Sequence, residues 1–128
     1  MARITATTGY EEKAAMINKR FSTLISRSPS AFAQALSGYD FALGPSLEIV
    51  ISSHEYDQYA NKMIKEIRKY YVPNKVVLMK TESNNLEKIA PYVSGQNPLN
   101  GKAVVYICRN FTCDYPVIDY KNIGEALK

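Results

Sequence analysis

Apolar residues in the first third of the chain recur every three or four positions, which is the spacing of one helix face. The first stripe follows the capping-box pattern Thr8-Gly9-Tyr10-Glu11 and predicts a helix over residues 9–27. Its members are Tyr10, Ala14, Ile17, Phe21, Leu24 and Ile25. Ser28-Pro29 begins a shorter stripe that stops at Gly44-Pro45. The pattern therefore predicts a helical hairpin over residues 9–43.

After Pro45 the apolar residues form short β-branched runs, which are typical of buried strands. These runs predict strands over residues 47–51, 75–80 and 103–107. A capping-box pattern at Ser52-Ser53-His54-Glu55 and an apolar stripe from Tyr56 to Tyr71 predict a helix between the first two strands. A weaker stripe over residues 84–92 predicts a second connecting helix, and Asp119 is expected to cap a short closing helix.

Strands that alternate with helices are typical of right-handed crossovers between parallel strands. We therefore expect an α/β fold in which the N-terminal helical hairpin precedes a small three-stranded parallel βαβαβ sheet and a short C-terminal helix. The sheet and closing helix would form an α/β unit over residues 46–128, within a single domain of residues 1–128. We favour the strand order three, two, one over two, one, three, because the hairpin would then cover the face that the connecting helices leave open.

Composition agrees with a folded chain and limits its partners. Hydrophobic residues make up 46% and charged residues 22%, close to the averages of globular proteins. No apolar run approaches the ~20 residues needed to span a bilayer, and the N-terminal residues lack the apolar core of a secretory signal. The net charge of +4 is spread among acidic residues. We therefore expect a cytoplasmic protein with no membrane and no nucleic-acid partner.

If the three strands are parallel, their carboxyl ends meet at the edge where open α/β sheets bind ligands. Ser53 and His54 follow the first strand, Cys108 and Arg109 follow the third, and Cys113 lies five residues beyond Cys108. Arg109 would favour a reactive thiolate, so these residues form a candidate ligand or redox site. The alternative is that both cysteines are structural and that His54 is a surface residue.

Other chemistries lack the residues that they need. Neither of the glycine-rich phosphate-binding motifs, G-x-G-x-x-G and G-x-x-x-x-G-K-[ST], occurs. One histidine and two cysteines do not make a recognisable set of zinc ligands. We expect no cofactor, no metal, no catalytic residue and no enzyme activity of the isolated chain. Because disulfides are rare in the cytosol, we expect two reduced thiols, with Cys108 more buried than Cys113 and Phe111 packed into the core.

Several segments resemble the family of large thioredoxin-domain-containing proteins of the spermatogenesis-associated protein 20 type, which has bacterial YyaL-like members. The longest is Gly101 to Pro116, with the cysteine pair at its centre. Shorter matching segments are Gly44 to Ile51, Tyr71 to Leu78 and Ala90 to Val93. The resemblance begins near residue 10 and runs to the end of the chain. It implies the C-terminal region of a larger protein that has an N-terminal thioredoxin-like domain and an epimerase-like (α/α) barrel.

This resemblance implies a non-catalytic C-terminal α/β module. The helices over residues 9–27 and 29–42 would correspond to the end of the barrel region, and no catalytic residue carries over. The expected partners are the thioredoxin-like and helical barrel domains of the parent protein. Without them the first helix would leave Ile17, Phe21 and Leu24 partly uncovered, so a homodimer through this face is also expected.

A second function stays open at this point. It is a small redox or ligand-binding unit that uses Cys108, Cys113, Arg109, His54 and Ser53.

Overall fold

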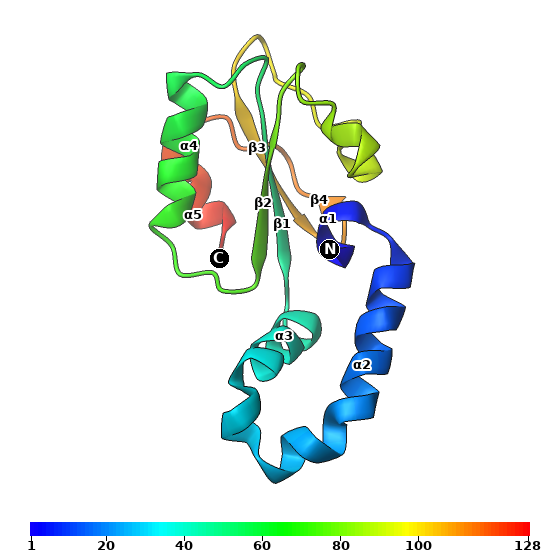
Figure 1. The fold of residues 1–128 in the computed structure, drawn as a ribbon. Helices are drawn as coiled ribbons and strands as arrows, with labels where there is room; N and C mark the ends of the chain where they lie inside the picture. The colour runs from blue at the N-terminus through cyan, green and yellow to red at the C-terminus, as the bar shows by residue number, and fades with distance from the viewer.

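A mixed four-stranded sheet forms the framework of the computed structural model, which describes residues 1–128 (Figure 1). Its strands are β1 (Leu47–Ser52), β2 (Lys75–Lys80), β3 (Val104–Arg109) and β4 (Thr112–Cys113). The strand order is β2-β1-β3-β4. β1 and β2 are parallel, but β3 runs antiparallel to β1, and β4 runs antiparallel to β3. The fold is α/β, but the expectations of a three-stranded parallel sheet and of the strand order three, two, one are both wrong.

The reversal of β3 follows from the segment that connects it to β2. The helix expected over residues 84–92 is replaced by two short 3-10 turns, η2 (Leu86–Lys88) and η3 (Pro91–Val93). Pro91 would interrupt a longer helix, because proline lacks the backbone N–H and restricts the preceding residue to extended conformations. Without a crossover helix the chain re-enters the sheet at the end where β2 finished, and the return strand is antiparallel.

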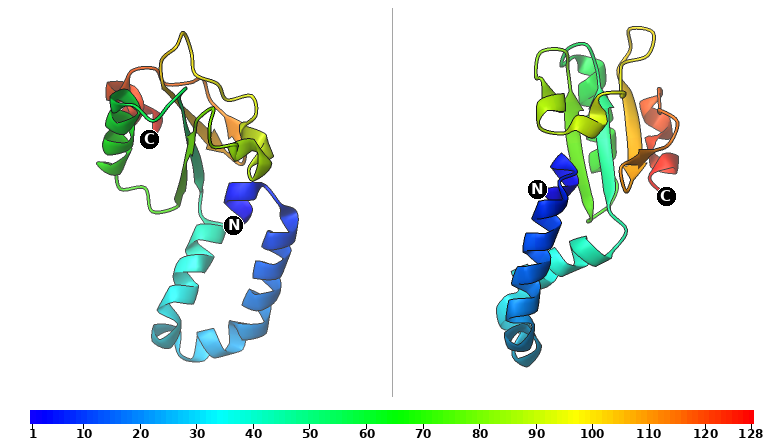
Figure 2. Two further views of the ribbon diagram at one scale, coloured as in Figure 1. Left: turned by 45° about the horizontal axis from the view of Figure 1, so that its top comes forward. Right: turned by 90° about the vertical axis from the view of Figure 1, so that its right-hand side faces the viewer.

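Different elements cover the two faces of the sheet (Figure 2). On one face, α4 (Gln58–Arg68) and α5 (Ile123–Ala126) pack on the larger core, which includes Ile49, Ile51 and Ile107. On the other face, the connector with η2 and η3 covers a smaller cluster around Val50 and Val93. The hairpin was expected to cover this second face, and that expectation is wrong because the connector takes its place.

Helix α4 begins later than its sequence pattern predicts. Ser52 still belongs to β1, where it pairs with Lys80 and Val104, and its hydroxyl donates to the Gln96 carbonyl at 2.9 Å. Asp57 caps α4 instead, because its carboxylate accepts a hydrogen bond from the Ala60 amide at 2.7 Å. The capping-box prediction at residues 52–55 is therefore wrong. The Asp119 cap is confirmed, although it opens a 3-10 turn, η4 (Tyr120–Asn122), ahead of α5.

The N-terminal helices form an arm that extends away from the sheet (Figure 1, Figure 2). The arm consists of α2 (Thr8–Arg27), the 3-10 turn η1 (Pro29–Phe32) and α3 (Ala33–Leu43). The predicted helical hairpin is thus confirmed. A short helix, α1 (Ala2–Thr5), precedes the arm, and its Arg3 reaches Asn110 at the tip of the β3–β4 hairpin. Ile25 is the one residue of α2 that is buried, so most of the apolar stripe is unpartnered.

Candidate functional site

The antiparallel direction of β3 divides the residues that the sequence placed in one site. Ser53 and His54 follow the end of β1, whereas Cys108 pairs with Glu48 near the beginning of that strand. Glu48 and Ser52 are four residues apart, which corresponds to about 13 Å along a strand. The expected gathering of all three strand ends at one edge is therefore wrong, and the two groups form separate sites.

The carboxyl ends of β1 and β2 form a polar edge where a histidine contacts a carboxylate. His54 Nδ1 lies 2.5 Å from Glu82 Oε1, and both side chains are exposed. A hollow of about 310 Å³ beside them has no hydrophobic residue in its lining, and Ser53 is buried at its wall. His54 lies in the turn before α4 rather than in its first turn. The imidazole contacts the Glu82 carboxylate, and no hydroxyl or thiol lies within hydrogen-bond distance of it to act as a nucleophile.

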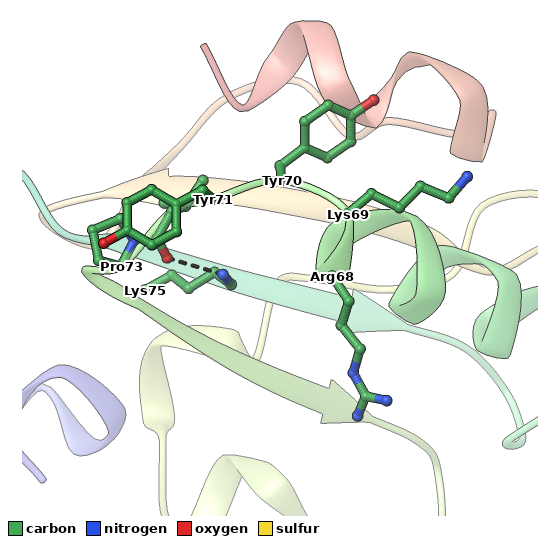
Figure 3. Close-up of a pocket in the computed structure, with 7 residues that line it drawn as sticks. Arg68, Lys69, Tyr70, Tyr71, Pro73 and Lys75 are labelled. Atoms are coloured by element: carbon green, nitrogen blue, oxygen red, sulfur yellow. Dashed lines mark hydrogen bonds between the residues drawn. The ribbon is translucent and has the colours of Figure 1, made fainter.

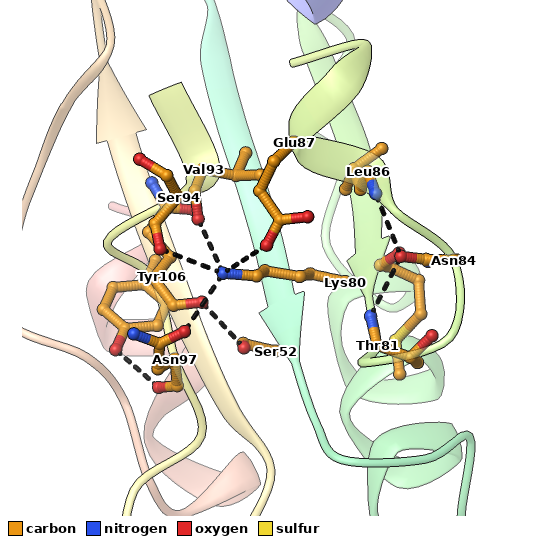
Figure 4. A network of polar contacts seen from close by, with 12 residues as sticks. Ser52, Lys80, Thr81, Asn84, Leu86, Glu87, Val93, Ser94, Asn97 and Tyr106 are labelled. Carbon is orange, nitrogen blue, oxygen red and sulfur yellow. Dashed lines mark hydrogen bonds and ion pairs between the residues drawn. The ribbon is translucent and has the colours of Figure 1, made fainter. Parts of the chain in front are cut away.

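Lys80 lies at the centre of a polar network at this edge (Figure 4). Its buried Nζ donates to the carbonyls of Val93 and Ser94 at 2.9 and 3.2 Å and to Asn97 Oδ1 at 3.1 Å. Glu87 Oε1 lies 3.1 Å away and supplies the opposite charge. The Glu87 amide and this lysine lower the pKa of the Glu87 carboxyl. The network ties the connector to β2 and leaves Lys80 without free hydrogen-bonding capacity.

A basic hollow lies at the turn between α4 and β2 (Figure 3). Arg68 and Lys69 point in different directions, and Lys75 Nζ donates to the Val72 carbonyl at 2.9 Å. Lys69 pairs with Glu66 at 2.6 Å, and the hydrogen bond and charge of that carboxylate raise the pKa of Lys69. These cations do not converge on a common point, so the hollow is not built to hold an anion.

Cys108 and Cys113 are joined by a disulfide in the β3–β4 hairpin. They are directly opposite each other in the ladder, and their Cα atoms are 3.8 Å apart. The prediction of two reduced thiols, which rested on the expected cytosolic location, is therefore wrong. No apolar pattern marks the two-residue strand that places Cys113 beside Cys108. The greater burial of Cys108 is confirmed, since Cys108 is fully buried and Cys113 is partly exposed.

Arg109 does not face the disulfide. Its pairing with Leu47 places it toward the opposite sheet face, and its guanidinium donates to Asp114 Oδ2 at 2.8 Å. Phe111 is half-buried rather than part of the core. Its ring makes an edge-to-face contact with Tyr92, with 5.0 Å between the ring centroids. Phe111 thus anchors the hairpin to the connector.

Glu48 is the functional candidate that the sequence analysis missed. Its side chain is completely buried between Val76 of β2 and Cys108 of β3 in the ladder. The carboxylate accepts a hydrogen bond from the Phe111 amide at 3.0 Å and another from Arg3 Nη1 at 3.4 Å. An acidic residue inside the apolar run Leu47–Ile51 was the signal that could have identified it, because buried carboxylates are rare unless paired.

Two buried polar atoms near Glu48 and the disulfide lack partners. The Tyr92 hydroxyl makes no hydrogen bond, and burial together with the negative charge of Glu48 raises the pKa of Tyr92 to about 12. Gln96 Nε2 donates to Cys113 Sγ at 2.9 Å and to Cys108 Sγ at 3.5 Å, but its Oε1 has no donor. The surroundings of the disulfide are therefore polar and incompletely satisfied.

The helical arm carries an exposed apolar surface. Ile17, Phe21 and Leu24 are 60, 44 and 51% exposed, which confirms that this stripe is only partly covered. A groove of about 920 Å³ runs between α2 and α3, and ten of its seventeen lining residues are hydrophobic. Exposed apolar surface of this kind marks interaction sites.

Two further features bear on the kind of site that the chain can form. No group of three or more histidine, cysteine or acidic side chains is arranged to hold a metal ion. None of the helices has both the length and the apolar character that crossing a membrane requires.

Comparison with known proteins identifies a longer relative. Spermatogenesis-associated protein 20 of Rattus norvegicus is 23% identical to the chain over 132 residues. The match covers 99% of this chain and 17% of the relative. No family model and no solved structure matches the chain. The similarity to this relative covers nearly the whole chain and confirms the expected resemblance to the spermatogenesis-associated protein 20 family.

Proposed function

We propose that this chain is a non-catalytic module of a longer cytoplasmic polypeptide, and that the α2–α3 arm docks it onto a helical surface of that polypeptide. The observation that carries the proposal is the apolar stripe of α2, where Ile17, Phe21 and Leu24 remain 44 to 60% exposed. Isolated helices are marginally stable in water and gain most of their stability from packing an amphipathic face. A 20-residue helix with one buried residue therefore calls for a further partner.

The groove between α2 and α3 favours a helical partner. Tyr10, Ala14 and Ile17 line it from α2, and Tyr39 and Phe41 line it from α3. A third helix can pack its side chains into the groove between two others at interaxial distances of about 8–10 Å. The apolar centre of the groove would then be shielded from water.

A partner within the same polypeptide is supported by the length of the relative. The chain spans 17% of spermatogenesis-associated protein 20, so most of that protein has no counterpart here. The family resemblance supports a position at the C-terminal end, next to an epimerase-like (α/α) barrel and in the same protein as a thioredoxin-like domain. In that position the arm would continue the helical packing of the barrel.

The polar edge supports a non-catalytic role. His54 is paired with Glu82, and the Lys80 ammonium is enclosed by four oxygen partners. No hydroxyl or thiol contacts the imidazole to act as a nucleophile, and the ammonium is fully engaged by Glu87 and by oxygens of the connector, so neither group is held ready for a substrate.

Photocrosslinking from α2 tests the docking proposal. Benzoylphenylalanine is placed at position 17, which belongs to both the exposed stripe and the groove, in the polypeptide as the cell makes it, and crosslinked peptides are mapped by mass spectrometry. We expect crosslinks to a helical segment outside residues 1–128 of the same polypeptide. Position 12 serves as the control, because Glu12 is exposed and does not line the groove.

Two results would contradict the proposal. Crosslinks between two copies of residues 1–128 would show the homodimer instead. A natural polypeptide with the 14.4 kDa mass of this chain alone would exclude docking within a longer protein.

A further inference from the structure

The β3–β4 hairpin places a disulfide beside a buried carboxylate, and the docking proposal uses neither. Glu48 of β1 is directly opposite Cys108 of β3, which is directly opposite Cys113 of β4. Directly paired residues project to the same sheet face, with Cβ atoms about 4.5–5.5 Å apart. The carboxylate and the two sulfurs therefore form one row across three strands.

The tip of the hairpin is attached to Glu48 in a backbone conformation that needs support. Asn110 and Phe111 have φ values of 52° and 62°, in the left-handed region that bulky residues rarely adopt. Such conformations persist only where surrounding contacts hold them. Here the disulfide closes the hairpin, and the Phe111 amide donates to Glu48 Oε2 at 3.0 Å.

Arg3 connects the same hairpin to the N-terminal helices. Its Nη1 donates to Asn110 Oδ1 at 3.1 Å and to Glu48 Oε1 at 3.4 Å, and its guanidinium lies 5.7 Å from the centre of the Phe111 ring. Because Arg3 belongs to α1, which leads directly into α2, the hairpin holds the start of the helical arm.

Gln96 offers a hydrogen-bond acceptor to the thiols of the reduced form. Its buried Oε1 lacks a hydrogen-bond donor, while its Nε2 contacts both sulfurs. A disulfide has no hydrogen to donate, but a cysteine thiol is a weak donor. Rotation of the Gln96 amide would let a thiol formed by reduction donate a hydrogen bond to Oε1.

We propose that Cys108–Cys113 is a thiol–disulfide exchange site for a dithiol reductant, and that its reduction releases the hairpin and Arg3 from Glu48. The reductant's thiolate attacks Cys113 Sγ, because Cys113 is partly exposed and Cys108 is fully buried. The new S–S bond joins the reductant to Cys113, and the Cys108–Cys113 bond breaks.

The remaining step balances the exchange. Cys108 leaves as a thiolate and takes up a proton from solvent. The second thiol of the reductant loses its proton, and its sulfur attacks the reductant sulfur that is bonded to Cys113. A disulfide forms within the reductant, and Cys113 leaves as a thiolate that takes up a proton. Two electrons and two protons have then passed from the dithiol to the cysteine pair, and the dithiol has become a disulfide.

Thiol labelling and amide hydrogen exchange test this inference on the native chain with dithiothreitol as the dithiol. Before reduction we expect no labelling by a maleimide. After reduction without denaturant we expect two labelled thiols per chain, with at least tenfold faster exchange at the Phe111 amide and unchanged exchange in β1 and β2. The inference is overturned if the untreated chain carries two free thiols, if reduction requires unfolding, or if Phe111 exchange does not change.

Arg3→Met tests the link to the N-terminal helices. This variant should lower protection in α1 of the oxidised chain, so that reduction adds no further loss there, while thiol release by dithiothreitol stays within twofold of wild type. Arg20→Met on the exposed surface of α2 is the matched control and should behave as wild type. Equal α1 protection in the wild type and in Arg3→Met would show that Arg3 does not connect the hairpin to α1.

Discussion

At the scale of single residues, Glu48 joins three parts of the chain that are far apart in sequence. Glu48 lies within β1, and its carboxylate accepts hydrogen bonds from the Phe111 amide and the Arg3 guanidinium. Removing one partner of a buried polar pair leaves the others unsatisfied, which costs more than the pair itself contributes. Glu48 should therefore affect stability more strongly than an exposed glutamate.

Substitution of Glu48 measures this effect. Glu48→Ala should lower the free energy of unfolding by about 3 kcal/mol, because it leaves the Phe111 N–H and Arg3 without their acceptor. Glu48→Gln should cost only about 1 kcal/mol, since its amide oxygen can still accept from Phe111. Urea unfolding gives both values, and equal losses in the two variants would contradict this role for the carboxylate.

Tyr92 allows a test by pH. Burial and the charge of Glu48 raise its pKa to about 12 in the folded chain, so folding favours the neutral phenol. The associated stability is fully present below pH 10 and is lost as the pH rises through about 12. In a spectrophotometric titration of the ten tyrosines, Tyr92→Phe should remove the step near pH 12. An unchanged titration curve would place that step on another tyrosine.

At the scale of elements, the sequence predicted local structure better than strand direction. The stripes of α2 and α3 and the β-branched run of β3 depend on neighbouring residues, and these elements occur where they were expected. The direction of β3 depends on whether residues 81–103 cross the sheet, which Pro91 and two short turns prevent. The periodicity of the strand itself is the same for either direction, so it could not distinguish them.

The candidate site was predicted only in part for the same reason. Cys108 and Cys113 were identified from their place after the third strand, but their grouping with His54 depended on a parallel β3. Arg3 and Gln96 reach the hairpin through tertiary packing, and no local pattern marks them. Sequence patterns could therefore identify single candidate residues, but the grouping of residues into one site required the tertiary structure.

The start of α4 provides a direct comparison between pattern and structure. Asp57→Ala should lower the free energy of unfolding by about 1 kcal/mol, because it removes the acceptor for the Ala60 amide. Glu55→Ala removes a similar charge from an exposed position and should change stability by less than ~0.5 kcal/mol. Thermal or urea unfolding compares the two, and a larger loss for Glu55→Ala would support the earlier helix start.

At the scale of the whole molecule, the sheet is covered on both faces while the helical arm is not. Phe21→Ser should change the free energy of unfolding by less than ~0.5 kcal/mol, since Phe21 is 44% exposed and belongs to no core cluster. Ile25→Ser alters the one buried residue of α2 and should cost about 2 kcal/mol. Urea unfolding of the isolated chain measures both. A large loss for Phe21→Ser would mean that the stripe is already packed within the chain.

Hydrogen exchange of α2 tests the docking account most directly. The amides of residues 10–24 are measured in the isolated chain and in the natural polypeptide, with the β1 amides as an internal reference. The account predicts at least tenfold slower exchange of α2 in the natural polypeptide and equal exchange of β1 in both. Equal exchange of α2 in the two samples would show that its apolar stripe stays uncovered and would contradict the docking role.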